Sequence, residues 1–150
     1  MTDSDAELFK AMDPFFNPKR IALVGASADY RKLGNSILMN LLASEIDVFP
    51  ITRSRDQVLG VKAYPDLASL PEPVDLVIVA VGAKYCASLM PEIKKAGARN
   101  AVVISGGFSE VGADGVEIEN ELAKHARELG DLMLASFKQI EADSAIVGQA

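Results

Sequence analysis

Residues 76–81 read Leu-Val-Ile-Val-Ala-Val, an unbroken apolar run. A strand with one face in water alternates polar and apolar side chains, whereas a strand covered by helices on both faces is apolar throughout. Residues 75–81 therefore predict a buried strand of a parallel sheet.

Similar apolar runs lie on both sides of this strand along the chain. Further strands are predicted at residues 21–24, 48–51, 101–104 and 132–134, with an extended piece at residues 61–64. Helices are predicted at residues 34–43, 84–96 and 116–129, the last two ended by Gly97 and Gly130. Before Pro14 the sequence predicts only one or two helical turns, and residues 136–150 show no regular pattern.

Strands and helices alternate, an order typical of parallel sheets with right-handed crossovers. The predicted fold class is α/β: a Rossmann-like, doubly wound, mainly parallel sheet with helices on both faces, in a single domain over residues 1–150. In such sheets ligands bind outside the carboxyl ends of the strands. We therefore expect a site in the loops after residues 24, 51, 81 and 104.

Composition narrows the classes of function. The 150 residues carry a net charge of −6, which disfavours nucleic acid and anionic membranes as main partners, because both select for clustered Lys and Arg. No apolar run reaches the roughly 18 residues needed to span a bilayer, and the polar first dozen residues do not resemble a secretory signal. A single cysteine, Cys86, excludes an internal disulfide, so we expect a cytoplasmic protein.

Few residues suit catalysis or metal binding. With His125 as the sole histidine and Cys86 as the sole cysteine, a Cys/His metal site is not expected. We predict that His125 lies on a solvated helix face and that Cys86 packs in the core, because no base partner for the thiol is evident.

Residues 24–35 join the first predicted strand to the first helix and carry features of a phosphate-binding loop. Gly25 permits a tight turn and a close approach of a ligand to the backbone. Gly34 and Asn35 stand where the helix begins, so their N–H groups are predicted to be free and to face an anion. Ser27 adds a hydroxyl donor, and basic residues follow at positions 31 and 32. On this interpretation, Gly25→Val abolishes binding but leaves the domain folded.

The spacing in this loop matches neither of the common nucleotide-binding patterns. The dinucleotide pattern G-x-G-x-x-G fails because its second and third glycines would be Ser27 and Tyr30, and no Gly-Lys-Ser/Thr of a P-loop follows. The alternative is an ordinary strand-to-helix turn with glycines for geometry.

Two arginines follow the second predicted strand, in the sequence Thr52-Arg53-Ser54-Arg55. An NAD site would place Asp or Glu here for the ribose hydroxyls. Arginines suit an extra phosphate instead, either the ribose 3′-phosphate of coenzyme A or the 2′-phosphate of NADP. Two solvated loop arginines are the alternative.

Together these features resemble the coenzyme A-binding domain of the ADP-forming acyl-CoA synthetases, which are related to the alpha subunit of succinyl-CoA synthetase. The resemblance runs from about residue 8 to residue 130. It is carried by residues 15–27 (FFNPKRIALVGAS), 60–67 (GVKAYPDL), 70–76 (LPEPVDL) and 104–110 (ISGGFSE). The last two segments are specific when found in this order.

The resemblance implies that coenzyme A lies across the strand ends, and it assigns residues to each part of the cofactor. The diphosphate falls on Gly25, Ala26, Ser27, Lys32, Leu33, Gly34 and Asn35. The adenosine end falls on Thr52, Arg53 and Arg55. The pantetheine path falls on Val81, Gly82, Ile104, Ser105, Gly106 and Phe108.

The chain also departs from this family. Arg53 and Gly82 stand where the family often has proline, and residues 135–138 read Ala-Ser-Phe-Lys where it usually continues with Gly-Pro-Asn-Cys into a second domain. The family's phosphohistidine and ATP-grasp domain have no counterpart in these 150 residues. We therefore expect a module that binds coenzyme A or acyl-CoA without completing a reaction alone, either as a stand-alone form or as a fragment. Residues 1–14 would be an extension and residues 136–150 a divergent tail.

The expected partners are ligase domains or subunits of an acyl-CoA synthetase, and self-association is also compatible with the sequence. Two other functions stay open. One is an NADP-binding redox sensor or oxidoreductase domain, which the arginines permit. The other is a structural or interaction domain whose ancestral site has decayed.

Overall fold

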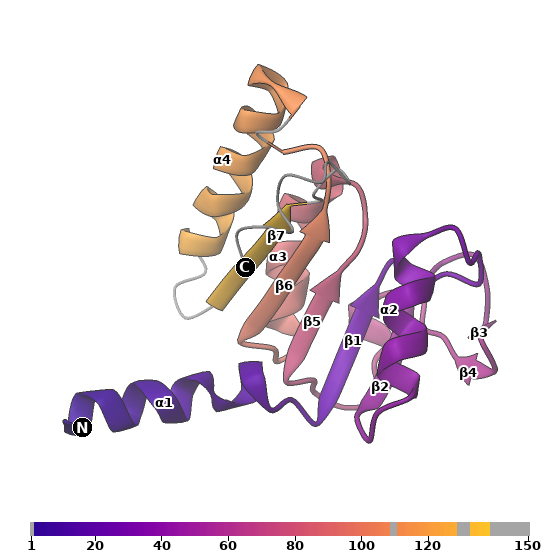
Figure 1. Cartoon of the computed structure of the whole chain (residues 1–150), viewed down its shortest axis with the longest axis horizontal. Coiled ribbons are helices and arrows are strands. Elements are labelled where there is room, and N and C mark those ends of the chain that lie inside the picture. Colours follow the sequence, from indigo (N-terminus) through magenta and orange to yellow (C-terminus); the bar gives the residue numbers. More distant parts are fainter. Residues whose placement is uncertain (1, 109–110, 129–132, 139–150) are drawn as a thin grey trace, which may run out of the picture.

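Five strands form one parallel sheet in the order β2-β1-β5-β6-β7 (Figure 1). They are β1 (Arg20–Val24), β2 (Asp47–Ile51), β5 (Leu76–Val79), β6 (Asn100–Ser105) and β7 (Met133–Lys138). This computed structural model describes residues 2–108, 111–128 and 133–138, with side chains described up to residue 128. All four pairings in the sheet are parallel, so the predicted α/β fold is confirmed.

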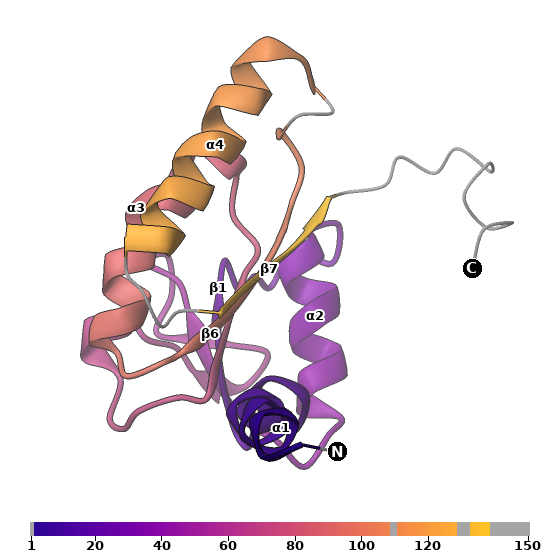
Figure 2. The ribbon, with the colours of Figure 1, turned by 90° about the vertical axis from the view of Figure 1, so that its left-hand side faces the viewer.

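Helices cover both faces of the sheet. Figure 2 shows α2 (Leu33–Leu42) on one side, and α3 (Ala83–Lys95) with α4 (Ala113–Glu128) on the other. Gly97 follows α3 with a φ of 84°, as predicted for its C-terminal cap, whereas Gly130 lies outside the described residues. Within the described part of the chain, no helix combines the length and the apolar character that crossing a bilayer requires.

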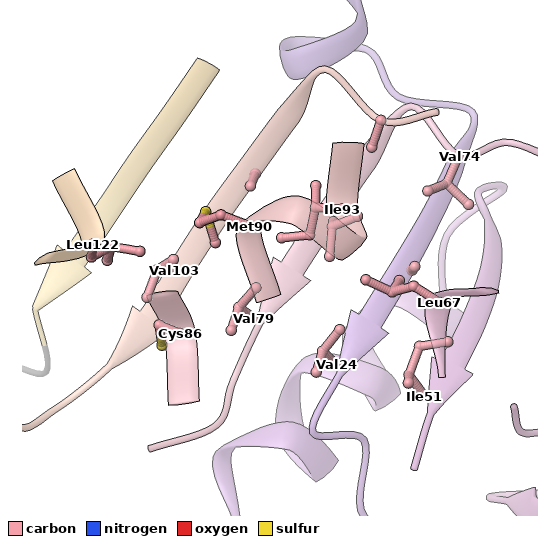
Figure 3. Close-up of a cluster of buried hydrophobic side chains, with 14 of the residues drawn as sticks. Val24, Ile51, Leu67, Val74, Val79, Cys86, Met90, Ile93, Val103 and Leu122 are labelled. Carbon is pink, nitrogen blue, oxygen red and sulfur yellow. The ribbon is translucent and has the colours of Figure 1, made fainter. Parts of the chain in front are cut away.

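Two hydrophobic cores explain why the strands are apolar on both faces. Successive side chains of a strand point to opposite sides of the sheet. Ala22 and Val24 pack in the core under α3, whereas Ile21 and Leu23 pack in the core that contains Leu38 of α2. Figure 3 shows the first of these cores.

The N-terminal helix is longer than the sequence predicts. Helix α1 (Asp3–Phe16) begins with a capping box, in which Thr2 and Asp5 exchange hydrogen bonds, and it continues through Pro14. A proline near the end of a helix removes only one backbone hydrogen bond, so two more residues can follow it. None of the residues of α1 is buried.

The C-terminal ends of two strands also differ from the prediction. Strand β7 reaches Lys138, four residues beyond its predicted end, because its backbone pairs with β6 from Asn100 to Ser105. Strand β5 ends at Val79 rather than at residue 81. Backbone pairing decides where a strand ends, and it can stop before an apolar run does, as in β5, or continue past it, as in β7.

A small hairpin lies beside the end of β2. Strands β3 (Gln57–Val58) and β4 (Val61–Lys62) are antiparallel, and the turn between them places Leu59 and Gly60 at φ values of 51° and 79°. Two successive positive φ values are those of a type I′ turn. The sequence predicts an extended piece over residues 61–64, which contains β4, but not β3, whose two residues are too few to show a period.

Candidate functional site

Among the residues that the structure describes, two clefts lie at the carboxyl edge of the sheet, where the sequence predicts a site. The first, of about 420 Å³, opens between the ends of β1 and β2 and the start of α3. We call it the apolar cleft, after Val24, Ile51, Pro65, Leu67, Val81 and Leu89. The second, of about 440 Å³, lies between the β1–α2 loop and the loop after β2. We call it the polar cleft, after Ser27, Asp29, Lys32, Ser54 and Arg55.

The hydrophobic core itself supplies much of the wall of the apolar cleft. Figure 3 shows Val24, Ile51 and Leu67 on the same side of the sheet, at one end of the core. Val24 and Ile51 end their strands, and Leu67 begins a short 3-10 helix, η1 (Leu67–Ser69). Apolar walls favour the binding of a flat apolar group, because binding removes the apolar surface of both the group and the walls from water.

Polar side chains also line the apolar cleft, namely Thr52, Arg53, Asp66, Tyr85, Ser88 and Glu92. Asp66 caps η1 by accepting a hydrogen bond from the Ser69 N–H at 2.9 Å. Hydrogen bonds from Ser69, and more weakly the positive charge of Arg53, hold the pKa of the Asp66 carboxyl below its usual value. The carboxylate therefore offsets part of the charge that Arg53 brings to this cleft.

Helix α3 contributes one whole face to the apolar cleft, and the sequence analysis did not identify it. Tyr85, Ser88, Leu89 and Glu92 stand at positions i, i+3, i+4 and i+7, which form one stripe on a helix. The Nζ atom of Lys84 lies 4.9 Å from the centre of the Tyr85 ring. The stripe is visible in the sequence, but only the fold shows that it turns toward the ends of β1 and β2.

The polar cleft gathers the positive charge predicted for the first loop. Arg31 is engaged within the loop, because its guanidinium donates two hydrogen bonds of 3.0 Å to the Asp29 carboxylate. These bonds lower the pKa of Asp29. Lys32 and Arg55 line the cleft, and among the described residues neither side chain makes a hydrogen bond or a close ion pair.

The start of α2 differs from the prediction that its N–H groups are free to face an anion. The Asn35 N–H donates to the Lys32 carbonyl at 3.0 Å, and its side-chain amide donates to the Ser27 carbonyl, also at 3.0 Å. The Gly25 N–H donates to the Ile51 carbonyl at 3.2 Å. The prediction of a free N–H is therefore wrong for Asn35, whose buried side chain fixes the loop from beneath.

Further free backbone donors lie earlier in this loop, while the prediction of a free N–H is not contradicted for Gly34. Ala26, Ser27 and Ala28 line the polar cleft, and their N–H groups have no hydrogen-bond partner among the described residues. Successive free amides in a tight loop form a concave anion site. The Ser27 hydroxyl accepts a hydrogen bond from the Asp29 N–H at 3.0 Å, which holds the loop closed on itself.

The end of β6 is tied to the loop after β5 beside the apolar cleft. The Ser105 hydroxyl, which is buried, donates to the Val81 carbonyl at 2.6 Å, and Val81 lines the cleft. The Phe108 side chain is wholly buried in the core, so it supports this loop from inside. Gly82, Ile104 and Gly106 do not line either cleft, and Leu33 is exposed on the first turn of α2. The pantetheine path over these loops stays a prediction.

Cys86 and His125 lie away from the two clefts. Cys86 is fully buried under α3, as predicted. His125 lies on α4, where each imidazole nitrogen stands 3.9 Å from a glutamate carboxylate, those of Glu121 and Glu128. The prediction of a surface position for His125 is confirmed, because more than a third of its side chain is exposed.

Comparison with known proteins identifies the kind of domain. Residues 19–138 match a family described as CoA binding domain. The alpha subunit of the ADP-forming acetate–CoA ligase II of Pyrococcus furiosus is 38% identical over 120 residues, which are 79% of this chain and 26% of that subunit. This chain thus spans about a quarter of the length of that relative.

Solved structures of two sizes share the fold. The dinucleotide-forming acetyl-coenzyme A synthetase 1 of Ca. Korarchaeum cryptofilum is 39% identical, with a TM-score of 0.73 over 79% of this chain and 26% of its own. A conserved hypothetical protein of Pyrococcus furiosus is 30% identical, with a TM-score of 0.61 over 79% of this chain and 92% of its own. The same domain therefore occurs within long chains and as nearly the whole of a short one.

Proposed function

This chain belongs to the CoA binding domain family, and from that premise we propose that it binds coenzyme A, or an acyl-CoA, at the carboxyl edge of its sheet. The observation that carries the proposal is the pair of neighbouring clefts with different chemistry. Gly25 and Ala26 are consecutive in the chain, but Gly25 lines the apolar cleft and Ala26 the polar cleft. In the same way, Arg53 lines the apolar cleft and its neighbour Ser54 the polar cleft. The clefts are therefore separated only by a ridge of these two loops.

The chemistry of the clefts fits the two ends of the cofactor's nucleotide. Adenine is flat and largely apolar, which suits the apolar cleft. The diphosphate and the ribose 3′-phosphate are anions, which suit Lys32, Arg55 and the free amides of residues 26–28 in the polar cleft. Asp66 and Glu92 in the apolar cleft repel anions, so the charges favour this one orientation.

This arrangement assigns different roles to the two arginines. Arg55 lines the polar cleft and is placed to pair with the 3′-phosphate, whereas Arg53 lines the apolar cleft near Asp66. Both arginines are predicted from the sequence to contact the adenosine end, and we keep both there. We give the phosphate contact to Arg55 alone.

The relatives support a proposal about the role of this chain in a larger enzyme. The alpha subunit of Pyrococcus furiosus belongs to an acetate–CoA ligase, so we infer that this chain supplies the cofactor-binding part of a related acid–thiol ligase. Ligase domains or subunits that carry the other catalytic groups are its proposed partners, and its proposed location is the cytoplasm. The relatives compared above are named for coenzyme A, which favours coenzyme A over the NADP alternative.

Isothermal titration of the wild type with coenzyme A, 3′-dephospho-coenzyme A and NADPH tests the proposal. We expect coenzyme A to bind most tightly, with the dephospho form weaker by about tenfold, because a hydrogen bond to a charged group contributes roughly 1.5–3 kcal/mol. Arg55→Ala should bring the two affinities close together. Arg53→Ala, the matched control, should keep them apart. Tighter binding of NADPH, or no binding of coenzyme A, would contradict the proposed function.

A further inference from the structure

The apolar cleft holds one carboxylate that nothing else in the described structure uses. Glu92 lines the cleft from α3, and its side chain makes no hydrogen bond or ion pair with the residues described. Asp66, the other acid of the cleft, is engaged by Ser69 and lies near Arg53. Glu92 is therefore the charged acceptor with free lone pairs.

Two hydroxyl groups of the cleft already make hydrogen bonds, whereas the Tyr85 hydroxyl makes none with the described residues. Thr52 shares a hydrogen bond of 3.0 Å with Ser54, and the Ser88 hydroxyl donates to the Tyr85 carbonyl at 2.9 Å. A base that enters the cleft loses the water around its polar edge, and a donor left without an acceptor weakens binding. The exocyclic amino group is the part of adenine that most needs an acceptor here.

We propose that the Glu92 carboxylate accepts a hydrogen bond from the amino group of the purine and makes the site selective for adenine. The inference rests on the proposed function, because it requires the base to occupy the apolar cleft. Glu92 stands two turns along α3 from Tyr85, with Leu89 between them, so the three side chains offer a carboxylate, an apolar surface and a ring along one line. A keto oxygen in place of the amino group would repel the carboxylate, because both oxygens are acceptors and neither can donate a hydrogen bond.

The test compares coenzyme A with its hypoxanthine analogue, in which an oxygen replaces the amino group. We expect the wild type to bind coenzyme A about tenfold more tightly than the analogue, since the hydrogen bond involves a charged group. Glu92→Gln should bring the ratio close to one, because an amide can donate to oxygen as well as accept. The side chain of Glu92 is exposed, so this variant is expected to melt at the temperature of the wild type.

Glu117→Gln on α4 is the matched control, since it removes the same charge from an exposed residue that lines neither cleft. It should keep the wild-type ratio. A Glu92→Gln ratio equal to that of the wild type, or a wild type without preference, would overturn this inference and leave the proposed function standing. A wild type that binds neither compound would instead overturn the proposed function itself.

Discussion

Gly25 and Gly34 meet where the first loop enters α2, and neither position has room for a side chain. A Cβ atom on Gly34 would lie 1.9 Å from the Gly25 carbonyl oxygen. One on Gly25, whose φ is 91°, would lie 2.5 Å from the Ala80 carbonyl oxygen. We therefore expect Gly25→Val to destabilise the domain as well as to weaken binding, because the added atoms would push on the backbone just after β5.

Gly34→Ala measures this packing directly. We expect the free energy of unfolding to fall by about 3 kcal/mol, because the obstacle is a backbone atom that cannot swing aside. Gly60→Ala is the control, since its φ is 79° but no atom lies within 4 Å of the added Cβ. It should cost about 1–2 kcal/mol through backbone strain alone. Equal losses in urea titrations of the two variants would contradict the close contact.

Cys86 links burial to the pH dependence of stability. Burial raises the pKa of its thiol from 9.0 to about 11. Between these values the unfolded chain loses the thiol proton while the folded chain keeps it, so this group lowers stability as pH rises. We expect the free energy of unfolding to fall more steeply between pH 9 and pH 11 in the wild type than in Cys86→Ala. Parallel curves for the two proteins would show that the thiol is not protected.

Helix α1 is the element that contributes least to the folded domain. It has no buried residue, and Leu8 and Phe9 on its surface are more than half exposed. It precedes β1, at the edge of the sheet opposite the two clefts (Figure 1). Only the end of the helix, at Phe15, packs against the core.

Removal of residues 1–12 tests this contribution. We expect the free energy of unfolding to change by less than about 1 kcal/mol and the affinity for coenzyme A to stay the same, since no buried contact is lost. Leu38→Ala in α2 is the contrast, because that side chain is fully buried and its loss should cost about 2–5 kcal/mol. A truncation as costly as Leu38→Ala would show that α1 supports the core.

The elements that the sequence predicts well are those whose burial leaves a pattern. The apolar runs at β1, β5 and β6 locate the centre of the sheet, because each of these strands faces two cores. Very short or backbone-paired strands leave no such pattern. The hairpin strand β3 has two residues, of which only Val58 is buried, and the last residues of β7 extend the strand by pairing with β6. The single residue Pro14 shortened α1 in the prediction.

For the whole molecule, the sequence predicts which loops lie together better than which residues line each cleft. Parallel strands bring their carboxyl ends to one edge, so the loops after β1 and β2 were correctly placed together. The two arginines are only two residues apart, and the sequence alone does not show that a ridge sends them to different clefts. The α3 face is distant in sequence, and its place in the site depends on the crossover that carries α3 over the sheet.

The two clefts differ in chemistry along the carboxyl edge of the sheet: the cleft beside α3 is mainly apolar, and the cleft beside α2 carries positive charge. A cofactor with a flat base at one end of its nucleotide and phosphates at the other can satisfy both clefts only in one orientation. The opposite edge offers a third cleft, of about 360 Å³, lined by Lys10 and Arg99 among others. It has positive charge but lies away from the loops that form the ridge.

A crystal structure of the chain with coenzyme A tests this orientation most directly. Adenine density between Leu67 and Leu89, with phosphate density within hydrogen-bond reach of Arg55 and the amides of residues 26–28, is the expected result. Density for the cofactor beside Lys10 and Arg99, or with the base in the polar cleft, would contradict the proposed site.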